Sequence, residues 1–316
     1  EPIVAFAFAA VRKKKTTIGP VAVCLGACSK GERDSKRTTV SHRVRDRLLM
    51  SSIFSITALI SLLFPVFGKG YARRRGMEPG WVRHRFWVPV GAFCLLVSLI
   101  ELGLRTGAWP MATVQGGLQT LALLLAIAWQ VLRRTDRMEA AGVILLGLVG
   151  MLIATSLIEP PSAGTAGVEN SFVAIHLALI FLGLVGYAVS FALSSLFLVQ
   201  RRRLKNKMLD GIQELPSLET LDGLNFRTQS LGFVALTSGI AMGFFLILEV
   251  EPTRSLNGPT IWGTGAVWLW YAIGLQTRLV GGWRGKTAAV FGVVGFVALG
   301  LIVGLAVVFV GGWHGV

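Results

Sequence analysis

The sequence predicts an all-α, polytopic integral membrane protein with about eight transmembrane helices. Of its 316 residues, 53% are hydrophobic and only 15% are charged, and the mean hydropathy is +0.66. Soluble globular domains do not have this composition. The apolar residues occur in runs of about 20, the length that crosses a bilayer as a helix. The basic residues fall in alternate connections between these runs.

Eight apolar runs are long enough to cross the membrane. Because no backbone polar group can stay unpaired in lipid, we expect all eight to be helices. The fifth run has 30 residues, which is more than a bilayer requires, so this helix should tilt or protrude. The eight predicted spans are 50–68, 86–104, 115–132, 138–158, 171–200, 228–249, 260–278 and 287–310.

The distribution of Lys and Arg predicts how these spans are oriented. The loops after the first, third, fifth and seventh spans hold 18 basic residues, whereas the other loops hold only Arg105 and Arg254. By the positive-inside rule the basic loops are cytoplasmic. Both ends of the eight-span core are therefore predicted to lie outside. The 18 residues are Lys69, Arg73, Arg74, Arg75, Arg83, Arg85, Arg133, Arg134, Arg137, Arg201, Arg202, Arg203, Lys205, Lys207, Arg227, Arg278, Arg284 and Lys286.

Residues 1–49 do not follow this pattern. They hold 11 basic residues, contain no run long enough to cross, and would lie outside. Met50 opens the first span and would be a natural start, so we interpret 1–49 as an upstream extension or a misassigned start. A lipoprotein-like leader before Cys28 and a disordered basic tail are the alternatives. The chain is thus divided into a basic extension, 1–49, and an eight-span membrane domain, 50–316.

Several classes of function have little support. The net charge of +15 and the pI of about 10.7 come from basic residues that lie mostly in short clusters between apolar runs, the pattern that orients membrane proteins. We therefore expect the lipid bilayer and no nucleic acid as a partner. The three cysteines form no zinc or CxxC spacing, and Cys94 is expected to be a small packing residue. The sequence contains no Ser-His-Asp pattern, HExxH motif or phosphate-binding loop. We therefore expect a non-catalytic protein.

Two histidines are predicted to lie at the same outer edge of the membrane. His176 is five residues into the fifth span, about 7–8 Å below its edge, and His314 follows the eighth span by four residues. Two neutral imidazoles at one face suit a metal or a heme iron. Taken singly, His176 could instead bond a neighbouring helix, and His314 could be an exposed tail residue. His84 lies in a basic cluster and is expected to be solvated.

Tryptophans near the same edge are further candidates. Trp262 and Trp313 are predicted at the outer interface, where they would form either an aromatic belt or a flat shelf for a planar ligand. Trp268 and Trp270 are deeper in their span and are expected to pack against neighbouring helices.

From His176 onward, the sequence resembles the cytochrome c assembly family of the CcsA/ResC type and its HemX-like relatives. The resemblance is carried by HLALIFLG from residue 176, LDGLNFRTQSLGFVALTSGIAMG (221–243), WYAIGLQTRLVGGWRGKTAAVFGVVGF (270–296) and GGWHG (311–315). It implies heme handling at the outer face for attachment to cytochrome c, with His176 and His314 as axial ligands of heme b. It further implies apocytochrome c and other assembly proteins as partners, and a bacterial cytoplasmic membrane as the location.

Two departures from this family indicate a divergent, HemX-like branch. The family's WxWDPKE-like signature should fall near 255–261, where the chain keeps only Pro259, and its intramembrane histidine is replaced by Gln276. An alternative function is therefore a membrane regulator or scaffold of a heme-biosynthesis enzyme, acting through the loop 201–227. A transporter of another small solute is a third alternative, disfavoured because the spans carry no carboxylate or lysine away from their ends.

Overall fold

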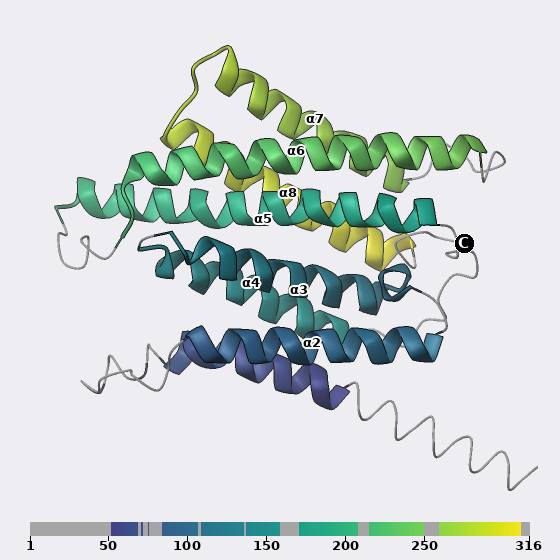
Figure 1. Ribbon diagram of the computed structural model, residues 1–316. Helices are drawn as coiled ribbons and strands as arrows, with labels where there is room; N and C mark the ends of the chain where they lie inside the picture. Colours follow the sequence, from purple (N-terminus) through teal and green to yellow (C-terminus); the bar gives the residue numbers. More distant parts are fainter. Residues whose placement is uncertain are drawn as a thin grey trace, which may run out of the picture. The chain divides into compact units, whose positions relative to one another are not determined.

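A computed structural model describes residues 52–68, 84–106, 109–135, 137–158, 171–207, 215–249 and 259–310, with Tyr71 and Arg75. Over these ranges the chain is all-helical, as predicted, and eight helices correspond to the eight predicted spans (Figure 1). The predicted extension 1–49 lies outside the described residues. The helices are Ser52–Gly68, α2 (His84–Thr106), α3 (Val114–Leu132), α4 (Glu139–Ile158), α5 (Ser171–Lys205), α6 (Leu218–Glu249), α7 (Pro259–Leu279) and α8 (Lys286–Val310).

The length and composition of these helices confirm a polytopic membrane protein. Within the described ranges, α2 to α6 each contain a segment long and apolar enough to cross a bilayer, and Ser52–Gly68 and Lys286–Ile302 are shorter apolar helices. Helix α7 is in neither group because its tryptophans, Tyr271 and Gln276 lower its hydropathy. Its place as a span remains a prediction.

The first three helices are joined by a buried polar triad. The hydroxyls of Ser55 and Ser98 are 3.0 Å apart, Ser98 donates to Gln119 Oε1 (3.1 Å), and Gln119 Nε2 donates to Ser55 Oγ (3.1 Å). All three side chains are fully buried. Interhelical hydrogen bonds of this kind hold membrane helices together where lipid supplies no hydrophobic driving force.

Helix α5 connects the two halves of the bundle. One face of it packs into the apolar core formed with the helices from Ser52 to α4, and another face packs into a second core with α6, α7 and α8. With 35 residues, α5 is about 52 Å long at 1.5 Å per residue. This exceeds the hydrocarbon thickness of about 30 Å, so the helix must tilt or protrude, as the length of the fifth predicted span required. Its basic residues from Arg201 to Lys205 are exposed.

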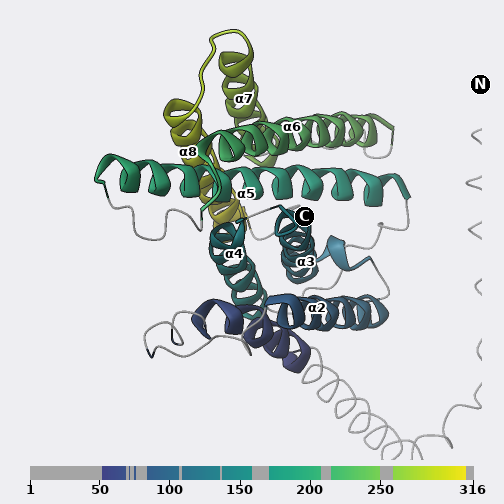
Figure 2. The ribbon, with the colours of Figure 1, turned by 60° about the vertical axis from the view of Figure 1, so that its left-hand side comes forward.

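Helices α5 and α6 run side by side with their backbones in close contact (Figures 1 and 2). A Cβ atom at Gly186 would lie 2.7 Å from the Cα of Gly232, and one at Gly183 would lie 3.1 Å from the Gly232 carbonyl oxygen. Larger residues at these positions would force the helices apart. Small residues at a membrane helix interface permit this approach.

The start of α6 differs from the prediction. The helix begins at Leu218, ten residues before the predicted span, so the predicted loop 201–227 is shorter than expected. Ser217 caps the helix, because its hydroxyl accepts the backbone N–H of Thr220 at 3.1 Å. Leu221 and Asn225 are buried. Hydropathy did not reveal this segment because its charges exclude it from a lipid span, although it continues the same helix.

Candidate functional site

The imidazole of His176 is held between α5 and α6. Its Nδ1 lies 2.8 Å from the carbonyl oxygen of Gly239 in α6. A carbonyl oxygen can only accept a hydrogen bond, so Nδ1 is the protonated nitrogen of this contact. In the neutral ring, Nε2 then carries the free lone pair that a metal requires. The hydrogen bond to a neighbouring helix that the sequence allowed for is present, and it leaves Nε2 as the unprotonated nitrogen of the neutral ring.

Two glycines of α6 make room for this ring. A Cβ atom at Gly243 would lie 2.6 Å from His176 Cε1 and 3.0 Å from Nδ1, so the imidazole occupies the space that a side chain would fill. One turn earlier, a Cβ at Gly239 would meet Ile180 Cδ1 at 2.8 Å. Residues four apart lie on the same helix face. Gly239 and Gly243 therefore form a smooth surface against which the His176 side of α5 rests.

Apolar side chains surround the predicted outer ends of these helices. Phe172 and Phe245 meet edge to face with their ring centroids 6.3 Å apart. Phe244 and Leu248 of α6 are about half exposed. This apolar surface next to His176 suits a flat hydrophobic ligand, for which aromatic contacts are favourable.

The structure describes some of the other predicted site residues but not all of them. Trp262 lies in the first turn of α7 with 68% of its surface exposed, as a belt or shelf residue would. Trp313 and His314 lie outside the described residues, so their role remains a prediction. Gln276 is exposed on α7. His84, expected to be a solvated residue of a basic cluster, is the first residue of α2.

The deeper tryptophans pack as expected. Trp268 donates its indole N–H to Thr237 Oγ1 at 3.0 Å and stacks on Phe233, which fixes α7 to α6. Trp270 stacks on Phe291 of α8 with centroids 4.4 Å apart. The prediction that Cys94 is a packing residue is also confirmed, since it packs against the first core.

Sequence reasoning missed the residues that position His176. Gly239 contributes a backbone carbonyl, and Gly243 leaves room for the ring because it has no side chain. Neither residue has a side chain whose chemistry would indicate a binding site. A signal was nevertheless present, because Gly239-Ile-Ala-Met-Gly243 is a GxxxG spacing, which indicates close approach of a second membrane helix.

Comparison with known proteins shows which family the chain resembles. Residues 111–314 match the family model described as "Cytochrome C assembly protein". This match covers more than half of the chain. The chain belongs to the cytochrome c assembly protein family. The matched region begins just before α3 and includes both predicted histidines.

Individual members of the cytochrome c assembly family resemble the chain to different extents. The cytochrome c biogenesis protein CcsA of Synechococcus sp. (strain CC9902) is 27% identical over 251 residues, which cover 70% of this chain and 82% of that protein. The protein of the same name from Chlamydomonas reinhardtii is 24% identical over 226 residues, covering 68% and 63%. That of Parasynechococcus marenigrum is 37% identical over 95 residues, covering 28% and 31%. No solved structure shows a significant match.

Proposed function

We propose that this chain binds heme b at the outer face of a bacterial cytoplasmic membrane and presents it for cytochrome c assembly. His176 and His314 are the axial ligands in this proposal, and Trp262 and Trp313 lie near the macrocycle. The observation that carries the proposal is the contact between His176 Nδ1 and the Gly239 carbonyl at 2.8 Å. Histidines that ligate metals characteristically donate their second N–H to such an oxygen.

The described part of the site fits an iron porphyrin. The Gly239 hydrogen bond fixes the ring orientation and directs the lone pair to Nε2, which is a nitrogen donor suited to heme iron. The half-exposed Phe172 and Phe245 supply apolar surface on the same helix ends. When bound, heme would supply the iron that accepts both imidazoles. The residues of the chain would orient the ligand and exclude water from its apolar faces.

The family of the chain and its charge distribution support the proposed location and partners. Relatives named as cytochrome c biogenesis proteins support a role in the same process. The charge distribution supports placing His176 on the side opposite the basic loops. Apocytochrome c and other assembly proteins would then meet the heme outside the cytoplasm. The chain itself would act as a binding and presenting component.

Heme retention tests this proposal. The chain is expressed in heme-replete cells and purified in detergent, and its heme content is measured by absorbance. We expect the unaltered protein to retain heme. The heme content of the His176→Ala/His314→Ala double variant should be at least about tenfold lower, because removing even the groups that support a metal ligand weakens metal binding by about that factor.

His84→Ala provides the matched control, because His84 lies in the basic cluster at the start of α2. This variant should keep the heme content of the unaltered protein. An unaltered protein without heme, or a double variant that keeps its full heme content, would show that the histidine pair is not the site.

A further inference from the structure

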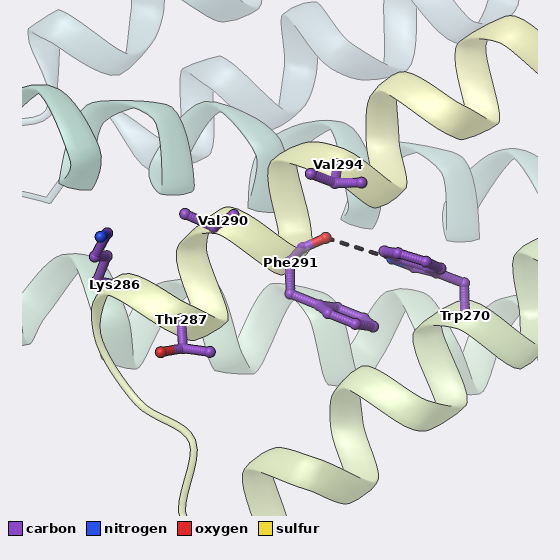
Figure 3. Close-up of a pocket in the computed structure, with 6 residues that line it drawn as sticks. All are labelled: Trp270, Lys286, Thr287, Val290, Phe291 and Val294. Atoms are coloured by element: carbon purple, nitrogen blue, oxygen red, sulfur yellow. Dashed lines mark hydrogen bonds between the residues drawn. The ribbon is translucent and has the colours of Figure 1, made fainter.

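An apolar groove lies between α7 and the first turns of α8. Its volume is about 320 Å³, and Figure 3 shows the six side chains around it. Neither this groove nor its residues belong to the histidine site. The lining residues are Trp270, Lys286, Thr287, Val290, Phe291 and Val294.

The groove is long and open on one side. Lys286, Val290 and Val294 are spaced four residues apart, so they follow one face of α8 over about 12 Å at 1.5 Å per residue. The floor is aromatic, because Trp270 stacks on Phe291 and donates its indole N–H to the Phe291 carbonyl at 3.4 Å (Figure 3). Val290 and Val294 are 40% and 46% exposed. Their exposed faces are available to a hydrophobic chain.

One end of the groove is cationic and polar. Lys286 and Thr287 lie there with their side chains exposed, and Arg284 is exposed two residues earlier. The six lining residues include no carboxylate, and the nearby Asp222 is paired with Arg278 at 2.6 Å. An anionic group at this end would therefore meet positive charge without a competing acid.

An exposed tryptophan, Trp283, lies beside this end of the groove. Trp283 is 42% exposed and meets Phe291 edge to face, with centroids 6.4 Å apart. Exposed tryptophans next to basic residues are typical of the membrane–water interface. With the predicted orientation, the cationic end would lie at the level of lipid headgroups and the valines at the level of acyl chains.

We propose that this groove binds an anionic phospholipid. One acyl chain lies along Val290, Phe291 and Val294, and the phosphate is held by the Lys286 ammonium and the Thr287 hydroxyl. The occupant is identified by its charge and shape, since a basic pocket on the predicted cytoplasmic side faces the anionic leaflet. The lining contains no histidine, cysteine or methionine for a heme iron.

Lipid binding to the full chain tests this inference. The protein is placed in neutral detergent and titrated with phosphatidylglycerol or phosphatidylcholine, and bound lipid is counted by native mass spectrometry. We expect phosphatidylglycerol to bind more tightly. Lys286→Gln should weaken it about fivefold, because one lysine near an anionic surface contributes about 1 kcal/mol. Val290→Trp should fill the groove and reduce binding of both lipids.

Lys205→Gln is the matched control, because Lys205 is an exposed lysine at the end of α5 that does not line the groove. It should leave phosphatidylglycerol binding unchanged. Equal affinity for the two lipids, or unchanged binding in both Lys286→Gln and Val290→Trp, would overturn the inference. Loss of heme rather than lipid in Lys286→Gln would also overturn it. Because the histidine pair is elsewhere, this test does not depend on heme binding.

Discussion

At the scale of single residues, the backbone of α6 fixes the orientation of the His176 ring. The Gly239 carbonyl determines which ring nitrogen carries the proton, and Gly243 leaves the space in which the ring lies. Both contributions come from the backbone of α6. A histidine held in this way would need little rearrangement to accept a metal, since its orientation is set before binding.

A methyl group at Gly243 should disturb this orientation. In Gly243→Ala the new Cβ would lie 2.6 Å from His176 Cε1, so the ring or the helix must move. We expect heme content to fall about tenfold, as it does when the supporting contacts of metal ligands are lost. Gly223→Ala is the control, because a Cβ at Gly223 meets nothing within 4 Å. Wild-type heme content and spectrum in Gly243→Ala would contradict the account.

The sequence indicated the candidate ligand His176 but not the residues that position its ring. His176 could be selected because an imidazole in an apolar span is chemically distinctive. The Gly239 carbonyl has no such signature, because every residue has a carbonyl and only the approach of α5 to α6 singles this one out. The placement of His314 and Trp313 remains a prediction from topology and resemblance.

At the scale of elements, the start of α6 and the end of α7 are joined by a buried ion pair. Arg278 is only 8% exposed and donates to both the carboxylate of Asp222 (2.6 Å) and its backbone carbonyl (2.7 Å). The same carboxylate accepts the backbone N–H of Gly285 at 3.3 Å, and Arg278 also lies over the ring of Phe226. These contacts connect three helices at the predicted cytoplasmic side.

Neutralising Asp222 should loosen this connection. Asp222→Asn leaves the Arg278 charge buried without a counter-charge, and we expect a loss of about 2 kcal/mol, between the values for exposed and fully buried pairs. Thermal unfolding of the purified protein measures this loss as a lowered midpoint. Glu219→Gln, an exposed acid one turn earlier in α6, should leave the midpoint unchanged. Equal midpoints for the two variants would show that the pair contributes nothing.

The element boundaries were predictable where the membrane defines them. Seven of the predicted spans begin within two residues of a helix start, because apolar runs in a bilayer can only be helical. Helix α6 is the exception, since its first ten residues carry Glu219, Asp222 and Arg227 and belong outside the lipid. Helix α5 likewise continues to Lys205 beyond its apolar run.

At the scale of the whole molecule, α5 connects the candidate ligand His176 to the rest of the bundle. It carries His176 near one end, exposed basic residues at the other, and contacts with both apolar cores between them. The all-α fold and the number of helices could be predicted from hydropathy. The packing that brings Gly239 to His176 could not, because small residues permit a close helix pair without specifying which helices form it.

The measurement that tests the central claim most directly is chemical rescue of His176. In His176→Gly, exogenous imidazole can occupy the space of the missing ring and donate the same kind of nitrogen to iron. The variant is purified with and without millimolar imidazole, and heme is followed by absorbance. We predict that heme is lost without imidazole and that its content and its bis-imidazole spectrum return when imidazole is added. Full heme content without imidazole, or no recovery in a correctly folded variant, would contradict the account.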